Sequence, residues 1–297
     1  MPLRVALLVN PTAGGGRGQR LTAAVRDRLR AGGAHVDVLV GDDAAGAAEL
    51  ARQAVAGGVD ALAALGGDGL VNLAATAVLG TGVPLAVVPA GTGNDAARML
   101  GLADPLSAVD VVLHGRRRAL DVGRVGGRVF VTVLSSGFDA RVTERANALT
   151  WPRGAARYPL AVLAELRVFR PVPYDVVIDG VPLHLPAMLV AVGNSRSYGG
   201  GMLVCPDADP TDGLLDVTVL TPLPTARFLR LFPSVYRGRH VGRPEVRTFR
   251  ARTVRLEAPA MTAYADGEPV GPLPVEVDVL PGALTVLAPQ GPAPAGG

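Results

Sequence analysis

The sequence of 297 residues predicts an α/β fold in which an open, mostly parallel βα sheet domain precedes a largely antiparallel, β-rich domain. Two observations carry this prediction. Short apolar runs and helical segments alternate from Val5 to Leu100, which is typical of a parallel sheet covered by helices on both faces. After Asp121 the sequence changes to short stretches of period-two alternation separated by turn residues, which is typical of antiparallel strands.

The first domain is expected to span residues 1–122 and to alternate strands with helices. The predicted strands are Val5–Asn10, Val36–Val40, Ala61–Leu65 and Leu85–Pro89, and the predicted helices are Gln19–Ala31, Ala44–Ala56, Leu70–Leu79 and Asn94–Leu100. Ligands of such sheets bind beyond the carboxyl ends of the strands. The loops that follow the strands are therefore the first place to look for a site.

The second domain is expected to span residues 123–282. Its predicted strands are Arg128–Leu134, Tyr174–Asp179, Ala187–Asn194, Leu214–Leu220, Thr248–Leu256 and Val275–Leu280, and its predicted helices are Arg153–Val168 and Pro224–Tyr236. A last strand, Ala283–Leu287, opens the segment 283–297. We expect that this strand can return to the first domain.

Composition narrows the class of protein. Hydrophobic residues make up 49% of the chain, which supports a packed globular protein. A single cysteine, Cys205, excludes an internal disulfide and a cysteine-based zinc cluster, and it fits a reducing cytoplasm. The apolar run Val5–Val9 is too short for an export signal, so we expect the protein to stay inside the cell. Aromatic residues are only 4% of the chain, which argues against nucleic-acid recognition by base stacking.

Three glycine-rich segments follow predicted strands of the first domain: Asn10–Gly16, Gly66–Gly69 and Gly91–Asp95. Glycine lets the backbone turn sharply and present N–H groups to phosphate oxygens, and the helix that follows directs its positive end there. Asp68 and Asp95 suit such a place only when a cation lies between carboxylate and phosphate, or when the carboxylate orients a proton. The three segments together predict a site for a magnesium nucleotide.

Two carboxylate pairs lie in the second domain. Asp266-Gly267-Glu268 places two carboxylates on a tight turn, and its alternative interpretation is a solvated hairpin corner. Asp209 and Asp212 are three residues apart and precede a glycine, so they can offer oxygens to a hard cation, although a simple turn cap would have the same sequence.

The basic residues of the chain are all arginine, because the sequence contains no lysine. Any phosphate clamp must therefore be an arginine or a backbone N–H group. Nine arginines lie between residues 227 and 255 against one acid, Glu245. With the apolar residues Phe228, Leu229, Leu231 and Phe232 they predict a basic amphipathic patch suited to an anionic membrane, unless they form only a solvated face.

Taken in order, these motifs make the chain similar to the bacterial diacylglycerol kinase and lipid kinase family, which shares its nucleotide-binding fold with NAD kinases. The similarity covers nearly the whole chain. It rests on Asn10-Pro11 with its glycine loop, Gly66–Gly69 with Asn72, Pro89–Arg98, Asp121-Val122-Gly123, Gly137–Ala140, Asp212–Asp216, Gly238–Val241 and Asp266-Gly267-Glu268.

The resemblance implies an ATP- and Mg²⁺-dependent kinase that transfers the γ-phosphate of ATP, bound in a crevice between the domains, to a lipid hydroxyl such as that of diacylglycerol. Asp266 would be the general base, Glu268 would help to orient the metal or the base, and Asp68 would organise water and Mg²⁺ at the phosphates. The residues implied to contact the nucleotide are Asn10, Thr12, Gly66, Gly67, Gly91, Thr92 and Asn94.

The resemblance also implies a structural Mg²⁺ site in the second domain, formed by Asp209, Asp212 and the carbonyl of Leu214. Asp95 and Asp121 would extend the acidic network. It implies work in the cytoplasm, peripheral to the inner membrane surface, with no nucleic-acid partner. The oligomeric state stays open, with a homodimer among the alternatives.

Two positions depart from the family pattern. The family usually has threonine after Gly-Gly-Asp-Gly and glutamate after the following asparagine, whereas this chain has Leu70 and Leu73. A hydroxyl and a carboxylate of the nucleotide region are therefore missing. These departures motivate one alternative, a weakly active nucleotide-binding regulatory protein. A second alternative within the same fold is a kinase of a soluble hydroxyl compound such as NAD.

Overall fold

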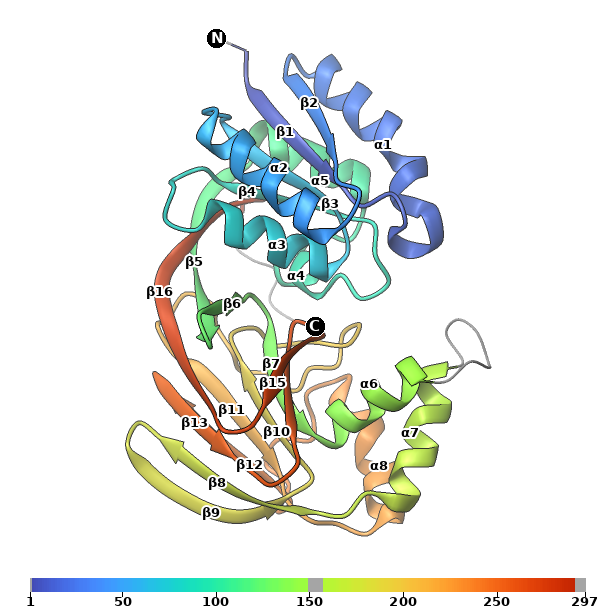
Figure 1. The fold of residues 1–297 in the computed structure, drawn as a ribbon, viewed down its shortest axis with the longest axis vertical. Helices are drawn as coiled ribbons and strands as arrows, with labels where there is room; N and C mark the ends of the chain where they lie inside the picture. The colour runs from blue at the N-terminus through green and yellow to red at the C-terminus, as the bar shows by residue number, and fades with distance from the viewer. Residues whose placement is uncertain (1, 149–156, 292–297) are drawn as a thin grey trace. The chain divides into compact units, whose positions relative to one another are not determined.

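The computed structural model describes residues 2–148 and 157–291. The chain divides into two compact units. Unit 1 comprises Met1–Val122, Gly199–Gly201 and Leu280–Gly297, and unit 2 comprises Gly123–Tyr198 and Met202–Val279. The mixed α/β prediction, with a mostly parallel sheet first and antiparallel pairing afterwards, is confirmed (Figure 1).

Unit 1 is built on parallel strands in the order β2-β1-β3-β4-β16. Its strands are β1 (Arg4–Val9), β2 (His35–Val40), β3 (Ala61–Gly66), β4 (Leu85–Pro89), most of β5 (Arg116–Val125) and the second part of β16 (Val275–Ala288). Its helices are α1 (Ala13–Ala31), α2 (Ala44–Ala56), α3 (Asp68–Val78), α4 (Asp95–Met99) and α5 (Pro105–His114). Helix α1 packs with α5, and α2 packs with α3 in front of the sheet in Figure 1. All residues of β3 and β4 are buried, as expected for strands covered on both faces.

Local sequence explains most helix boundaries of unit 1. Asp43 begins α2 by accepting a hydrogen bond from Gly46 N at 2.7 Å, and Asp104 begins α5 by accepting one from Ser107 N at 2.7 Å. Helix α1 formally includes Gly14, Gly15 and Gly16, whose φ angles of +56°, +67° and +87° are not helical. The regular helix therefore starts after the glycine loop, close to the predicted start at Gln19.

Unit 2 contains two sheets with antiparallel pairing. One joins the first part of β16 to β13, β8 and β9 in that order, with β5 paired to β16 and β6, and the other has the order β12-β11-β10-β7-β14-β15. The strands are β6 (Arg128–Phe130), β7 (Val133–Gly137), β8 (Val172–Ile178), β9 (Val181–Ala187), β10 (Leu189–Gly193), β11 (Leu215–Leu220), β12 (Val246–Ala251), β13 (Thr253–Glu257), β14 (Thr262–Ala265) and β15 (Glu268–Pro272). The helices are α6 (Phe138–Ala148), α7 (Arg157–Val168) and α8 (Thr225–Val235), which gather on one side of the unit in Figure 1.

Several predicted boundaries in unit 2 were wrong. The stretch 128–134 forms two strands, and 248–256 is divided at Arg252 between β12 and β13. Strand β16 is one strand of 14 residues where two were predicted, because Pro281 and Gly282 do not interrupt it. Helix α6 and strands β9, β14 and β15 of unit 2 were not predicted, and neither were α5 and β5, which lie wholly or mostly in unit 1. Residues 153–156 of the predicted helix Arg153–Val168 lie outside the described residues.

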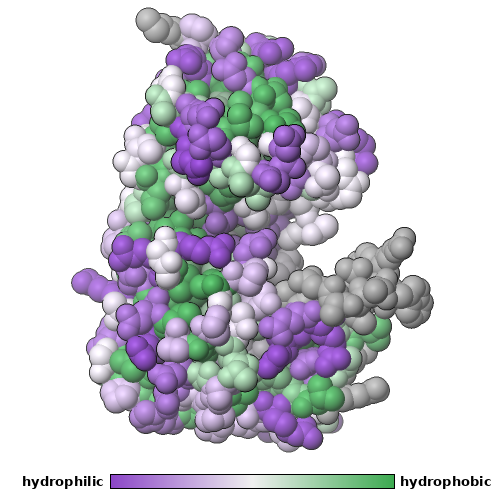
Figure 2. Space-filling view, in the orientation of Figure 1, coloured by the Kyte–Doolittle hydropathy of each residue, from purple (hydrophilic) through white to green (hydrophobic). Residues whose placement is uncertain are grey.

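The core of unit 2 packs hydrophobic side chains from both of its sheets, including Phe130, Leu134, Tyr174, Val190 and Leu256. The hydroxyl of Tyr174 meets Ser136 Oγ at 3.1 Å, so its polar atom is satisfied inside the core. On the face shown in Figure 2, hydrophobic residues reach the surface among hydrophilic ones over both units. Within the described part of the chain, no helix has the length and apolar character needed to cross a membrane.

Candidate phosphate site and apolar pocket

The loop after β1 is tied down by its own side chains. Asn10 Oδ1 accepts hydrogen bonds from Thr12 N at 3.1 Å and from Thr12 Oγ1 at 2.9 Å. At Gly14 a Cβ atom would lie 2.3 Å from the carbonyl oxygen of Ala90, at the end of β4. Only glycine allows this contact, and its φ of +56° also disfavours other residues. The loop is therefore held against the carboxyl end of a neighbouring strand.

The loops after β3 and β4 pack glycine on glycine. A Cβ atom on Gly91 would lie 2.5 Å from Gly67 Cα, so neither backbone could approach the other with a side chain between them. The second loop is closed by Asn94, whose Oδ1 accepts from Gly91 N at 2.9 Å and whose Nδ2 donates to Gly91 O at 2.8 Å. Thr92 is exposed at the tip. The seven residues expected at the nucleotide thus lie on three adjoining loops of unit 1.

Asp68 lies between the last two of these loops. Its Oδ1 accepts a hydrogen bond from Ala96 N at 3.1 Å, and a Cβ atom on Gly93 would lie 2.7 Å from its Oδ2. The side chain is half-buried. A fixed carboxylate among glycine loops at the ends of parallel strands has the chemistry to hold a hard cation beside phosphate oxygens.

Two further aspartates of unit 1 bind backbone of their own unit. Asp95 is 3% exposed, and its carboxylate accepts hydrogen bonds from Gly200 N at 2.8 Å and Gly201 N at 2.9 Å. Asp121 Oδ1 accepts one from Gly282 N at 2.7 Å. Asp95 thereby attaches the segment 199–201 to α4, and Asp121 attaches β16 to β5. Both carboxylates therefore have a structural role.

The two leucines that depart from the family pattern lie on α3. Leu70 is 8% exposed, and its side chain covers Gly66, where a Cβ atom would lie 2.7 Å from Leu70 Cδ2. Leu73 is half-buried. Leu70 therefore contributes to the packing of α3 on the end of β3.

In unit 2, the turn Asp266-Gly267-Glu268 joins β14 to β15. Asp266 has a φ of +50°, and its carboxylate accepts hydrogen bonds from Val131 N and Thr132 N, both at 2.8 Å, and from Thr132 Oγ1 at 2.5 Å. The side chain of Glu268 is exposed, and its carboxylate accepts no hydrogen bond within the described ranges 2–148 and 157–291. The two carboxylates are therefore unequal, because one fixes the turn and the other faces solvent.

The expected metal ligands lie on the loop before β11. Asp209 Oδ1 accepts from Thr211 N at 3.1 Å and from Thr211 Oγ1 at 2.6 Å, and Asp212 Oδ1 accepts from Leu214 N at 3.0 Å. Hydrogen bonds from an aspartate side chain to the backbone two residues later are typical of Asx turns.

The same loop lies beside a buried carboxylate and an arginine. Arg250 pairs with Asp212, and its Nε lies 3.7 Å from Asp216 Oδ2, a buried oxygen that has no hydrogen-bond partner in the described structure. Burial raises the pKa of Asp216 to about 6. Arg250 already faces the carboxylates of Asp212 and Asp216 with positive charge, and no three acidic, histidine or cysteine side chains converge for a metal in the parts of the chain that are described.

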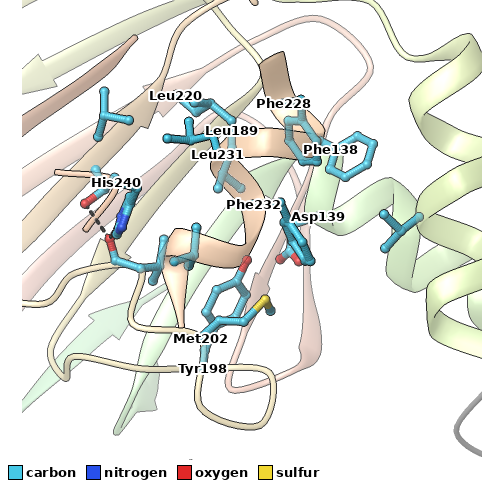
Figure 3. A pocket seen from close by; sticks show the side chains of 15 residues that line it. Phe138, Asp139, Leu189, Tyr198, Met202, Leu220, Phe228, Leu231, Phe232 and His240 are labelled. Atoms are coloured by element: carbon cyan, nitrogen blue, oxygen red, sulfur yellow. Dashed lines mark hydrogen bonds between the residues drawn. The ribbon is translucent and has the colours of Figure 1, made fainter. Parts of the chain in front are cut away.

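Unit 2 also contains an apolar pocket that was not predicted from the sequence. Its cavity of about 70 Å³ is lined by residues of α6, α7 and α8, of β10 and β11, and of the segment 198–204 (Figure 3). Phe138 and Phe228 meet with ring centroids 5.1 Å apart, and Phe228 stacks on Phe232 at 5.7 Å. The spacing of Phe228, Leu231, Phe232 and Val235 on one face of α8 was the available signal.

Two buried polar residues border this pocket. Asp139 Oδ2 accepts a hydrogen bond from Ser135 Oγ at 2.6 Å. His240 Nε2 donates to the carbonyl oxygen of Val204 at 3.1 Å (Figure 3), which places a proton on Nε2. Burial lowers the pKa of His240. Cys205, beside Val204, is buried, and burial raises the pKa of its thiol to about 12, which makes it an inert packing residue.

Comparisons with known proteins agree with these two halves. Residues 4–125 match the diacylglycerol kinase catalytic domain, and residues 132–288 match the YegS C-terminal NAD kinase beta sandwich-like domain. A diacylglycerol kinase of Mycobacterium tuberculosis is 43% identical over 295 residues, which cover 97% of this chain and 96% of the relative. A diacylglycerol kinase of Bacillus subtilis is 30% identical over 282 residues, with 92% of each chain covered.

Solved structures show the same fold. A diacylglycerol kinase from Bacillus anthracis has a TM-score of 0.74 at 21% identity, with 97% of both chains covered. An NAD kinase from Archaeoglobus fulgidus in complex with ATP has a TM-score of 0.54 at 12% identity, with 98% of this chain and 94% of that chain covered. At such identities these structures support the fold, whereas the sequence relatives show the family. The resemblance inferred from the motifs is confirmed, and the chain belongs to the diacylglycerol kinase and YegS-like lipid kinase family.

Proposed function

We propose that the protein transfers the γ-phosphate of ATP, with Mg²⁺, to the hydroxyl of a diacylglycerol-like lipid in the cytoplasm at the inner membrane surface. The observation that carries the choice of acceptor is the apolar pocket of unit 2. A soluble acceptor such as NAD would need polar groups along its binding site, because buried polar groups without partners are costly. Hydrocarbon lining of this kind suits an acyl chain instead.

The nucleotide belongs on the three glycine loops of unit 1. Their backbone N–H groups supply hydrogen bonds to phosphate oxygens in a chain that has no lysine. Asn10, Thr12, Gly66, Gly67, Gly91, Thr92 and Asn94 remain the proposed contacts. Bound Mg²⁺ would neutralise negative charge on the phosphate oxygens. Asp68 remains the carboxylate proposed to organise water and Mg²⁺ there, and its position between two of the glycine loops supports this role.

The turn Asp266-Gly267-Glu268 supplies the proposed base. As the lipid hydroxyl oxygen bonds to the γ-phosphorus, the bond from that phosphorus to the bridging oxygen of ADP breaks, and the hydroxyl proton passes to a carboxylate. The sequence suggested Asp266 for this role. Its three hydrogen bonds support a role in holding the turn, and the exposure of Glu268 makes that residue the stronger candidate for the proton acceptor.

The structural cation of unit 2 remains a proposal on Asp209, Asp212 and the Leu214 carbonyl, with Asp216 as the adjoining buried carboxylate. Arg250 already supplies positive charge to Asp212 and Asp216. Titration with Mg²⁺ should therefore raise the thermal midpoint more in Arg250→Gln than in the unmodified protein. An equal response of both proteins would mean that this loop takes no cation.

The function is tested by incubating the protein with labelled ATP and Mg²⁺ against diacylglycerol and monoacylglycerol in mixed micelles, and against NAD in solution. We expect label in phosphatidic acid. Transfer to NAD alone would favour the alternative of a soluble acceptor. ATP binding without transfer to any acceptor would favour a regulatory protein, the alternative suggested by Leu70 and Leu73.

A further inference from the structure

The structure divides the arginines of residues 227–255 into two groups. Three form ion pairs within unit 2: Arg227 with Glu245 at 2.5 Å, Arg250 with Asp212, and Arg255 with Glu257 at 3.0 Å and Glu276 at 3.3 Å. The guanidinium group of Arg247 lies over the ring of Phe249. In contrast, Arg230, Arg237, Arg239 and Arg243 have no ion pair within residues 2–148 and 157–291. Arg247 and Arg252 also have no ion pair among the described residues, so four of the six arginines without an ion pair lie on α8 and the turn that follows it.

The outward face of α8 is unusual for a surface helix. Its inward face carries Phe228, Leu231, Phe232 and Val235, which line the pocket. A helix on an aqueous surface normally turns polar residues outward. Here the outward face carries Leu229, 46% exposed, and Tyr236, 50% exposed, beside Arg230 and Arg237. Residues 225–244 contain five arginines and no aspartate or glutamate.

Apolar side chains flanked by arginines are the pattern of a helix that lies in the interface of an anionic bilayer. Leucine and tyrosine enter the boundary between headgroups and acyl chains, while arginines remain among the lipid phosphates. An acidic protein or a nucleic acid would use the arginines but would gain little from the exposed leucine. Charge and apolar exposure together therefore select a bilayer as the partner.

We infer that the outward face of α8 with Leu229, Arg230 and Pro233, together with Tyr236 and Arg237 directly after the helix, is the surface by which the protein docks on an anionic lipid bilayer. The inference rests on the proposed function for its meaning, because the inward face of the same helix walls the proposed acyl pocket. Docking by α8 brings this wall to the bilayer.

The cavity adds a second reason to place the bilayer at α8. Pockets for ligands of drug size usually measure about 300–1,000 Å³, so a cavity of about 70 Å³ must widen before it takes an acyl chain. Helix α8 is suited to yield, because Pro233 lies inside it and offers no N–H group, and its N-cap Pro224 makes no side-chain cap. A bilayer that binds the outward face of α8 contacts the same helix that must move for the pocket to widen.

The test is sedimentation with vesicles of phosphatidylglycerol and phosphatidylcholine, without ATP or acceptor. Arg230→Gln with Arg237→Gln should lower the partition coefficient at least tenfold at low salt, and Leu229→Gln with Tyr236→Gln should lower it by a similar factor. The matched controls are Arg117→Gln with Arg252→Gln, two exposed arginines without an ion pair among the described residues, and Val181→Gln, which removes an apolar side chain that is 66% exposed on β9. We expect both controls to bind like the unmodified protein.

Insertion can be followed directly with a polarity-sensitive fluorophore on Leu229→Cys, because the native thiol of Cys205 is buried. Its emission should shift to the blue on phosphatidylglycerol vesicles, whereas the same label on Val181→Cys should not respond. If only the arginine variant loses vesicle binding and the emission of the label at residue 229 does not shift, the helix does not enter the bilayer. The arginines would then serve to bind another polyanion. Equal binding by all variants would exclude α8 altogether.

These outcomes do not depend on the kinase proposal. If the α8 variants lose vesicle binding but still phosphorylate a dispersed short-chain diacylglycerol, both the docking surface and the proposed function stand. If the unmodified protein binds vesicles through α8 but phosphorylates no lipid, the docking surface stands and the proposed function fails.

Discussion

The phosphate loops of unit 1 and the apolar pocket of unit 2 are built in opposite ways. The loops are fixed by backbone contacts and short side-chain caps, such as Gly14 against Ala90 O and Asn94 on Gly91. The pocket is fixed by the packing of aromatic and aliphatic side chains on α8 and its neighbours. A backbone site tolerates almost no added atom, whereas a packed wall can shift and repack. The first is therefore expected to be rigid and the second adaptable.

The largest effect is expected when one methyl group is added to the glycine loops, which tests whether they are rigid. Gly14→Ala should cost several kcal/mol of stability and abolish ATP binding, because its Cβ would overlap Ala90 O. Gly15→Ala is the matched control, since Gly15 also has a positive φ but has nothing within 4 Å of its Cβ position. It should cost only about 1–2 kcal/mol. Thermal melts and ATP titration of both variants give the difference, and equal losses would show that conformation alone matters.

The turn Asp266-Gly267-Glu268 in unit 2 is also held by hydrogen bonds to the backbone, although it lies outside the phosphate loops. Glu268→Gln should lower kcat at least about a hundredfold with an unchanged thermal midpoint, as expected for an exposed proton acceptor. Asp266→Asn should lower both kcat and the midpoint, because an amide N–H₂ would face Val131 N or Thr132 N. Should Glu268→Gln retain its kcat, the proton acceptor is Asp266, as the sequence suggested.

A smaller effect is expected where side-chain packing supports the loops. Leu70→Thr would return the hydroxyl that the family usually carries at this position. With Leu70 buried over Gly66, we now expect a loss of about 2 kcal/mol of stability and no gain in ATP affinity. Leu73→Glu, at a half-buried position, should cost less. Calorimetric ATP titration beside thermal melts decides the point, and tighter ATP binding by Leu70→Thr would place the phosphates nearer to this helix.

The smallest predicted effect lies beside the pocket. Burial lowers the pKa of His240, so as pH falls the unfolded chain takes up a proton at this residue before the folded chain does. Stability from this residue is present above the unfolded pKa, about 6.5, and is lost as pH falls below it. His240→Gln keeps a donor for Val204 O but cannot be protonated. Between pH 7.5 and 5.5 the thermal midpoint of this variant should fall by less than that of the unmodified protein, and parallel curves would contradict the assignment.

The two sites also differ in how far the sequence could predict them. Gly66-Gly67-Asp68 and Gly91–Asp95 were readable because a backbone site leaves glycine and aspartate at strand ends, where few other residues fit. The pocket was not readable, because Phe138, Leu189 and Phe228 look like ordinary core residues until the fold brings them together. Hydrogen bonding was equally hidden: nothing near Asp266 in the sequence indicates that Val131 and Thr132 would bind its carboxylate.

Fold elements followed the same division. The first four strands of unit 1 were predicted to within one residue at each end, since β1, β3 and β4 are nearly continuous apolar runs between turns, whereas α5 and β5 were missed. In unit 2, strands β9 and β15 contain prolines and exposed residues, so their pattern resembles a loop. Helix α6 follows β7 without an intervening turn residue, because Gly137 ends the strand and Phe138 begins the helix.

Strand β16 sets the order in which the protein can be completed during synthesis. Val286, near the end of the chain, pairs with Leu85 of β4, about two hundred residues earlier. Most of the βα repeats leave the ribosome early, yet their sheet keeps an open edge at β4 until β16 is made. Unit 2 is synthesised within that interval. Strand β16 thus closes the first unit after the second has been made, and a nascent chain cut short before residue 280 would carry an unpaired hydrophobic edge that chaperones and proteases recognise.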